Sequence, residues 1–137
     1  MLLRVAASLS LLTFVGHTIG TFMPLPPEQV QMHTTVTSMK ATMVPMPVGS
    51  PRSYMQLLDG NNLCTSLLML LCAMLLFTLA REASSRVVDR VIGITALALA
   101  GVSILSLLYF FPVPAAFTGL AAALSLIALR ARTAARA

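Results

Sequence analysis

The chain has 137 residues, of which 58% are hydrophobic and only 9% are charged. About a quarter of the residues of a soluble domain are charged, so this composition excludes an ordinary soluble globular protein. In a soluble protein, a net charge of +5 would suggest binding to nucleic acid. Here the arginines flank apolar segments, which favours membrane lipids as partners and argues against nucleic acid. The length fits a single integral membrane domain over residues 1–137.

Four apolar stretches define the predicted architecture, at about residues 2–23, 63–80, 91–111 and 113–129. Each is about as long as a helix must be to cross a hydrocarbon core roughly 30 Å thick. None contains Asp, Glu or Lys, and only Arg4 interrupts them. Because backbone polar groups must be paired internally in lipid, we predict an all-α fold, a polytopic membrane four-helix bundle.

The positions of Lys and Arg predict the orientation in the membrane. Segment 24–62 and the turn between the last two stretches hold only Lys40 and Arg52. The other seven cations lie at the two termini and in the loop at 81–90: Arg4, Arg81, Arg86, Arg90, Arg130, Arg132 and Arg136. Positive charge marks the cytoplasmic side, so we expect the N-terminus and the C-terminus in the cytoplasm.

The first apolar stretch has two possible interpretations. Arg4 followed by an apolar run could belong to a signal peptide, but no small-x-small cleavage site follows before Pro24. We therefore expect the stretch to be retained as a transmembrane helix.

Segment 24–62 is predicted to carry an extracytoplasmic amphipathic helix. After the prolines at 24, 26 and 27, apolar residues recur at alternating intervals of four and three, which is the spacing of one helix face, until Pro45 and Pro47 end the helix. These residues are Met32, Val36, Met39, Met43 and Met46. Ser50 then offers a cap, and Pro51 a first position, for a following helix.

The methionines leave two alternatives. Thioethers are soft ligands that bind Cu(I), and His33 adjoins Met32. The regular spacing is, however, what an interfacial helix with methionine as adaptable apolar filler requires. We therefore predict no metal site.

The last two apolar stretches contain small residues at helical spacing, which lets helices approach closely in lipid. They are Gly93, Ala96, Ala100 and Ser103 in one stretch and Ala115, Gly119 and Ala123 in the other. We expect these two helices to pack against each other as an antiparallel pair.

Polar residues near the outer side of the bundle are the candidate site. His17 lies two-thirds of the way along the first stretch, and an ionisable group at such a depth is a functional candidate. The candidate catalytic residues are His17, Asp59 and Arg52, and the candidate ligand-binding residues are His17, Arg52, Tyr54 and Asn62. A polar site would form if they converge beneath segment 24–62. The alternative for His17 is a neutral imidazole hydrogen-bonded to a neighbouring helix.

Three sequence elements resemble a family of small bacterial four-helix inner-membrane proteins of unknown function. They are Gly-His-Thr-x-Gly at 16–20, Gly-Ser-x-Arg-Ser-Tyr at 49–54 with Gly60, and Tyr-Phe-Phe-x-x-Pro at 109–114. The resemblance implies a multi-pass protein of the bacterial plasma membrane and directs attention to His17, Arg52 and Tyr54. At the level of fold alone, the arrangement is similar to DoxX-type and sterol-isomerase-type bundles.

Three functions remain open from the sequence. The first, which the lack of catalytic motifs and the small-residue helix faces favour, is a non-catalytic accessory or scaffold subunit that contacts a membrane protein partner or another copy of itself. The second is an enzyme or binding protein for a lipophilic small molecule such as a quinone, sterol or isoprenoid, using His17. Transport or Cu(I) handling is the third. No sequence motif identifies a cofactor.

Overall fold

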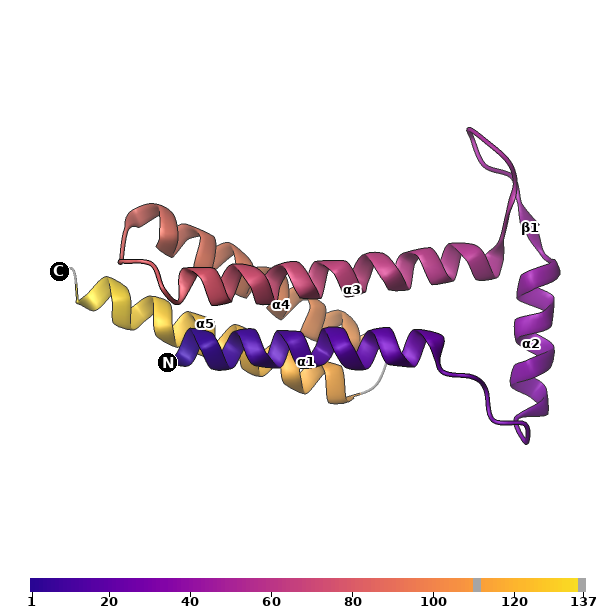
Figure 1. Ribbon diagram of the computed structural model, residues 1–137, viewed down its shortest axis with the longest axis horizontal. Coiled ribbons are helices and arrows are strands. Elements are labelled where there is room, and N and C mark those ends of the chain that lie inside the picture. Colours follow the sequence, from indigo (N-terminus) through magenta and orange to yellow (C-terminus); the bar gives the residue numbers. More distant parts are fainter. Residues whose placement is uncertain (110–111, 136–137) are drawn as a thin grey trace. The chain divides into compact units, whose positions relative to one another are not determined.

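The computed structural model describes residues 1–109 and 112–135, and within them the chain is almost entirely helical (Figure 1). The all-α prediction is confirmed. Phe110, Phe111 and Arg136 lie outside the described residues. The elements in chain order are α1 (Leu2–Phe22), α2 (Val30–Ala41), β1 (Met43–Val44), β2 (Arg52–Ser53), α3 (Tyr54–Leu79), α4 (Arg86–Tyr109) and α5 (Pro112–Ala134).

Four helices of the described chain, α1, α3, α4 and α5, are long and apolar enough to cross a membrane. The chain is therefore a multi-pass integral membrane protein. Helices α3, α4 and α5 begin before the predicted apolar stretches, most of all α3, which begins at Tyr54 and not near residue 63. At 1.5 Å per residue, its 26 residues span about 39 Å. This exceeds a hydrocarbon core of roughly 30 Å, so α3 is longer than the core requires.

The chain divides into two compact units, residues 1–16 with 67–137 and residues 17–66. The first, here the bundle unit, takes its core from all four long helices. That core contains Leu3, Ala6, Ala7, Met69, Cys72, Leu76, Leu79, Ile92, Leu99, Ala121, Ala122 and Ala128.

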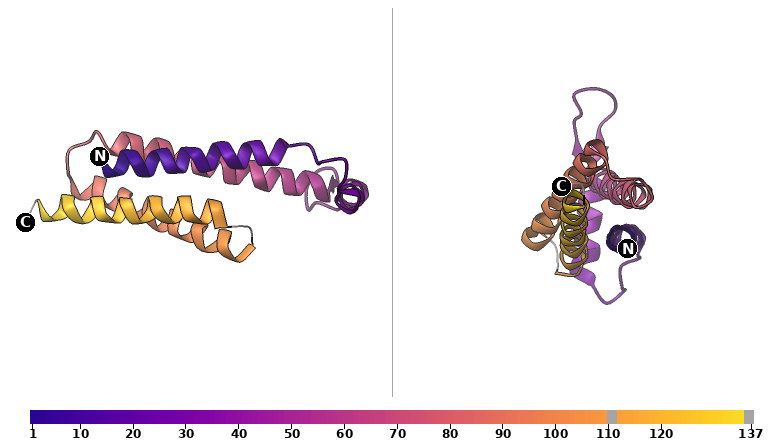
Figure 2. Two further views of the ribbon diagram at one scale, coloured as in Figure 1. Left: turned by 90° about the horizontal axis from the view of Figure 1, so that it is seen from below. Right: turned by 90° about the vertical axis from the view of Figure 1, so that its left-hand side faces the viewer.

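Helices α4 and α5 form a closely packed antiparallel pair, as predicted (Figure 2). A Cβ placed on Gly119 would lie 2.8 Å from Ser103 Oγ, and one on Gly93 would lie 3.6 Å from Leu129 Cδ2. Ser103 Oγ also donates a hydrogen bond across the pair to the carbonyl oxygen of Ala115, at 2.8 Å. Small residues thus allow a close approach and a polar link between helices, both of which stabilise helix pairs in lipid.

The second unit, here the outer unit, holds the end of α1, all of α2, a two-stranded hairpin and the start of α3. Within it, α2 lies crosswise to the ends of α1 and α3 (Figures 1 and 2). The strands pair antiparallel, with Met43 opposite Ser53 and Val44 opposite Arg52. A helix crosswise to the spans is the arrangement expected of an interfacial helix.

The predicted methionine stripe is only partly right. Helix α2 ends at Ala41, so Met43 lies in β1 and Met46 in the turn that follows, while Met32, Val36 and Met39 remain on the helix. The reason is proline chemistry. The residue before a proline is driven to extended backbone, and Pro45 and Pro47 together favour extended chain after Thr42, whose own ψ is 110°.

The predicted cap at Ser50 is also wrong, because α3 is capped by Ser53. Ser53 Oγ accepts the backbone N–H of Gln56 at 3.2 Å, and Gln56 Oε1 accepts the backbone N–H of Ser53 at 2.9 Å. This is a reciprocal capping box. Residues before it turn back to form β2, so Pro51 precedes a strand and not a helix.

Candidate functional site

The outer unit contains one polar contact between two membrane-spanning helices. His17 Nδ1 of α1 lies 3.0 Å from Ser66 Oγ of α3. Ser66 is buried and His17 is half-buried. The contact links two long membrane-spanning helices, so we take it as the centre of the candidate site.

The capping box positions Ser66 by fixing where α3 begins. Once Ser53 starts the helix, Asp59, Asn62 and Ser66 follow at intervals of three and four residues and therefore share one helix face. Asp59 and Asn62 are both half-buried. By helix rise, Asn62 lies about 6 Å and Asp59 about 10.5 Å from Ser66 along the axis of α3.

The position of His17 depends on the last turns of α1. The hydroxyl of Thr21 donates to the carbonyl oxygen of His17 at 2.9 Å. This local bond gives a hydrogen-bond partner to one of the backbone carbonyl groups near the end of the helix. His17 lies five residues before Phe22, about 7.5 Å from the end of α1 by helix rise.

The structure places the predicted site residues on different elements. The structure joins His17 to a neighbouring helix and places Asn62 and Asp59 on the same face of α3 as its partner. It does not bring Arg52 or Tyr54 to His17, because Arg52 lies exposed in β2 and Tyr54 is 54% exposed at the start of α3. Within residues 1–109 and 112–135, no hydrogen bond or ion pair joins His17 to Arg52 or Asp59.

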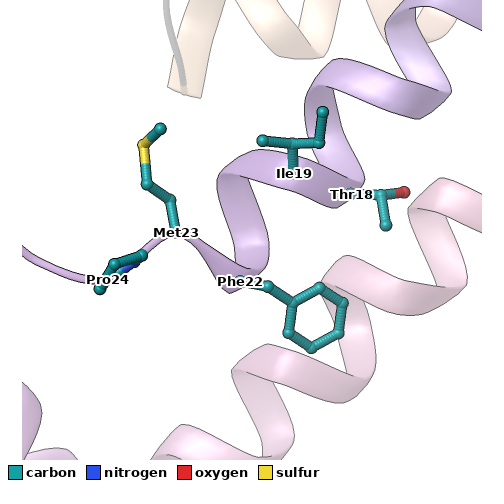
Figure 3. Close-up of a pocket in the computed structure, with 5 residues that line it drawn as sticks. All are labelled: Thr18, Ile19, Phe22, Met23 and Pro24. Carbon is teal, nitrogen blue, oxygen red and sulfur yellow. The ribbon is translucent and has the colours of Figure 1, made fainter.

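A shallow apolar hollow lies near the end of α1. Its lining residues are Thr18, Ile19, Phe22, Met23 and Pro24, whose side chains spread apart and leave the hollow open (Figure 3). Phe22 and Met23 are largely exposed. Neither His17 nor Ser66 is among its lining residues.

The described residues offer little for a metal ion. They include no group of three or more His, Cys, Asp or Glu side chains close enough to hold one. His33 is exposed, and its Nε2 lies 3.2 Å from the carbonyl oxygen of Pro26.

The sequence analysis missed an ion pair in the bundle unit. Arg132 Nε of α5 lies 3.3 Å from Asp89 Oδ1 in the first turn of α4. Arg132 Nη2 also donates to the carbonyl oxygen of Glu82, at 3.0 Å, which ties the end of α5 to the connection between α3 and α4. Asp89 could have indicated this pair, because an acidic residue next to a membrane span usually has a cationic partner. The positions of the arginines were interpreted only as evidence of topology.

Comparisons with family models, with curated proteins and with solved structures find no match to this chain.

Proposed function

We propose that this membrane protein binds a lipophilic small molecule, such as a quinone, sterol or isoprenoid, beside His17 and Ser66. The observation that carries the proposal is the 3.0 Å contact between His17 Nδ1 and Ser66 Oγ. It fixes an imidazole within a membrane-spanning segment, where ionisable groups are expensive and usually functional.

The contact also orients the imidazole. With Nδ1 engaged by Ser66, the ring keeps Nε2 for a second hydrogen bond, and a neutral imidazole has one donor and one acceptor nitrogen. The last turns of α1 and the residue after it also expose apolar side chains to the bilayer, among them Ile19, Phe22 and Met23. A few polar groups beside apolar surface are typical of small-molecule sites.

Whether the site also catalyses a reaction depends on proton transfer by His17. An imidazole can act as a general acid or base when a substrate atom comes within hydrogen-bond reach. Asn62 and Asp59 line the same face of α3 and are available to a ligand that extends outward. Arg52 and Tyr54 lie farther along the chain, in and beside the hairpin, where they could contact a ligand only at the outer surface.

Native mass spectrometry of the protein, extracted gently from its own membrane, tests the proposal. We expect a stoichiometric small-molecule adduct that is lost in His17→Phe, which keeps a ring of similar size without its nitrogens. The matched control is His33→Phe, the same substitution on the exposed helix α2, which should keep the adduct. A wild-type protein without any adduct would count against this function.

A second candidate is a non-catalytic accessory or scaffold subunit that binds a membrane protein partner or another copy of itself. It is favoured by Gly16 and Gly20 on α1, since a Cβ on either would meet no atom within 4 Å. In contrast, Gly119 lies against Ser103. Glycines four residues apart on an apolar helix are typical of helix–helix contacts in membranes. Co-isolation of a larger membrane protein, lost in Gly16→Leu, would support it.

We also propose the bacterial plasma membrane as the location, with both termini in the cytoplasm, and membership of the small four-helix family that the chain resembles. The seven cations at the termini and the 81–90 loop support the orientation. Within the bundle unit, the start of α1, the end of α5 and the α3–α4 connection lie at the same end (Figure 1), as one shared side requires.

A further inference from the structure

The hydroxyl of Ser66 differs from other buried hydroxyls of this protein. Ser10, Thr13 and Ser125 each donate to the carbonyl oxygen four residues earlier in their own helix. Ser66 is 2% exposed, and within the described residues its side chain has a single hydrogen-bond partner, His17 Nδ1. Its proton therefore has one acceptor available.

This arrangement determines the tautomer of His17. A buried hydroxyl proton without an acceptor is unfavourable, and more so in an apolar medium. Ser66 Oγ–H must donate to Nδ1, so Nδ1 carries a lone pair. In a neutral imidazole the proton then lies on Nε2, which becomes a hydrogen-bond donor.

Within the outer unit, residues 17–66, the Nε2–H group has no protein acceptor. From this we infer that His17 Nε2–H donates to the carbonyl oxygen of a molecule dissolved in the bilayer, a statement that rests on the proposed binding function. A carbonyl offers lone pairs and brings no proton of its own. A hydroxyl head group would bring a donor that needs a further acceptor in the apolar span.

Two sources can supply such a carbonyl. One is the head of a lipophile such as a quinone, and the other is the acyl ester of a bilayer phospholipid. His17 lies about 7.5 Å from the end of α1 by helix rise, which is compatible with either source. The two sources can be distinguished by the phospholipid that surrounds the protein in the experiment, because ether-linked phospholipids lack the ester carbonyl.

Nitrogen NMR of the full-length protein labelled with ¹⁵N-histidine tests this inference directly. The substitution His33→Gln leaves His17 as the one labelled residue, since the chain has two histidines. Samples in nanodiscs of ether-linked or ester-linked phospholipid would be compared alone, with a short-chain benzoquinone and with cholesterol. We expect the proton on Nε2 throughout. In the ether lipid, the quinone should shift the Nε2 resonance and cholesterol should not.

Each other result has a definite meaning. A proton on Nδ1, or an equal response to cholesterol and quinone, overturns the carbonyl inference while leaving a binding site possible. A response to ester lipid and none to quinone keeps the carbonyl chemistry but removes the small-molecule function. An Nε2 resonance that responds to none of the probes overturns both.

A pair of serine substitutions checks that the tautomer depends on Ser66. Ser66→Ala removes the donor to Nδ1, so both tautomers should be populated and quinone binding should weaken by about 5-fold, the effect of losing one typical hydrogen bond. Ser8→Ala removes an exposed hydroxyl from α1 and should leave the spectrum and the affinity unchanged. Equal spectra for Ser66→Ala and the wild type would contradict the inference.

Discussion

Asp89 and Arg132 join the beginning of α4 to the end of α5, with Arg132 Nε 3.3 Å from Asp89 Oδ1. Asp89 is 6% exposed, and it lies in the first turn of its helix, where negative charge is favoured by the helix dipole. Ser85 caps the same turn by accepting the backbone N–H of Val88 at 3.2 Å. The pair therefore stabilises the end of the bundle unit at which the α3–α4 connection also lies.

Removing the cation of this pair should destabilise the bundle unit. Arg132→Gln removes the guanidinium that lies 3.3 Å from the buried Asp89 carboxylate and its hydrogen bond to the carbonyl of Glu82, so we expect a loss of about 2 kcal/mol in the free energy of unfolding. Reversible unfolding of the protein in detergent micelles would measure it. Arg130→Gln, which changes an exposed arginine on the same helix, should stay within about 0.5 kcal/mol of the wild type. Equal stabilities of the two variants would show that the ion pair contributes nothing.

Gly119 should not tolerate even a methyl group. In Gly119→Ala the new Cβ would lie 2.8 Å from Ser103 Oγ, which is itself held by its bond to Ala115. The α4–α5 pair must shift, at an expected cost of about 1–3 kcal/mol. Thermal unfolding in micelles would detect this. Gly16→Ala is the control, since its Cβ meets no atom within 4 Å and helix propensity predicts a gain of up to about 1 kcal/mol. The prediction fails if both alanines raise the stability.

The start of α3 should depend on Ser53. Ser53→Ala removes one half of the capping box and should cost about 1 kcal/mol. Hydrogen exchange should then quicken at the first turn, around Tyr54 and Gln56. Ser50→Ala alters an exposed residue outside the helix and should not change the exchange. If Ser50→Ala had the larger effect, the helix would begin where the sequence alone suggested.

The proposed orientation can be tested with single cysteines. In a background of Cys64→Ala and Cys72→Ala, Val48→Cys places a thiol in the turn of the hairpin and Ala83→Cys places one in the α3–α4 connection; both positions are exposed. In intact cells, a membrane-impermeant maleimide should label the first and spare the second until the membrane is opened. The reverse pattern would invert the topology, and labelling of both would refute a single fixed orientation.

The sequence by itself determined that this protein lies in a lipid bilayer and how many helices cross it. Apolar stretches without acids or lysines can be stable only as helices in lipid, because their backbone must satisfy its own hydrogen bonds. The same reasoning found the close α4–α5 pair, since Gly119 and Ser103 are useful only where two helices approach closely. These features are local in sequence, so pattern and composition are sufficient to predict them.

Only the tertiary structure shows which side chains on different helices contact each other. Nothing in the sequence around Ser66 indicates that it contacts His17, which is 49 positions away. The contact between Asp89 and Arg132, which are 43 positions apart, is equally absent from the local sequence pattern. The hairpin likewise depended on backbone pairing between Met43 and Ser53. Such contacts depend on how helices rotate and pack against one another, and the spacing of residues along one segment carries no information about the face of another.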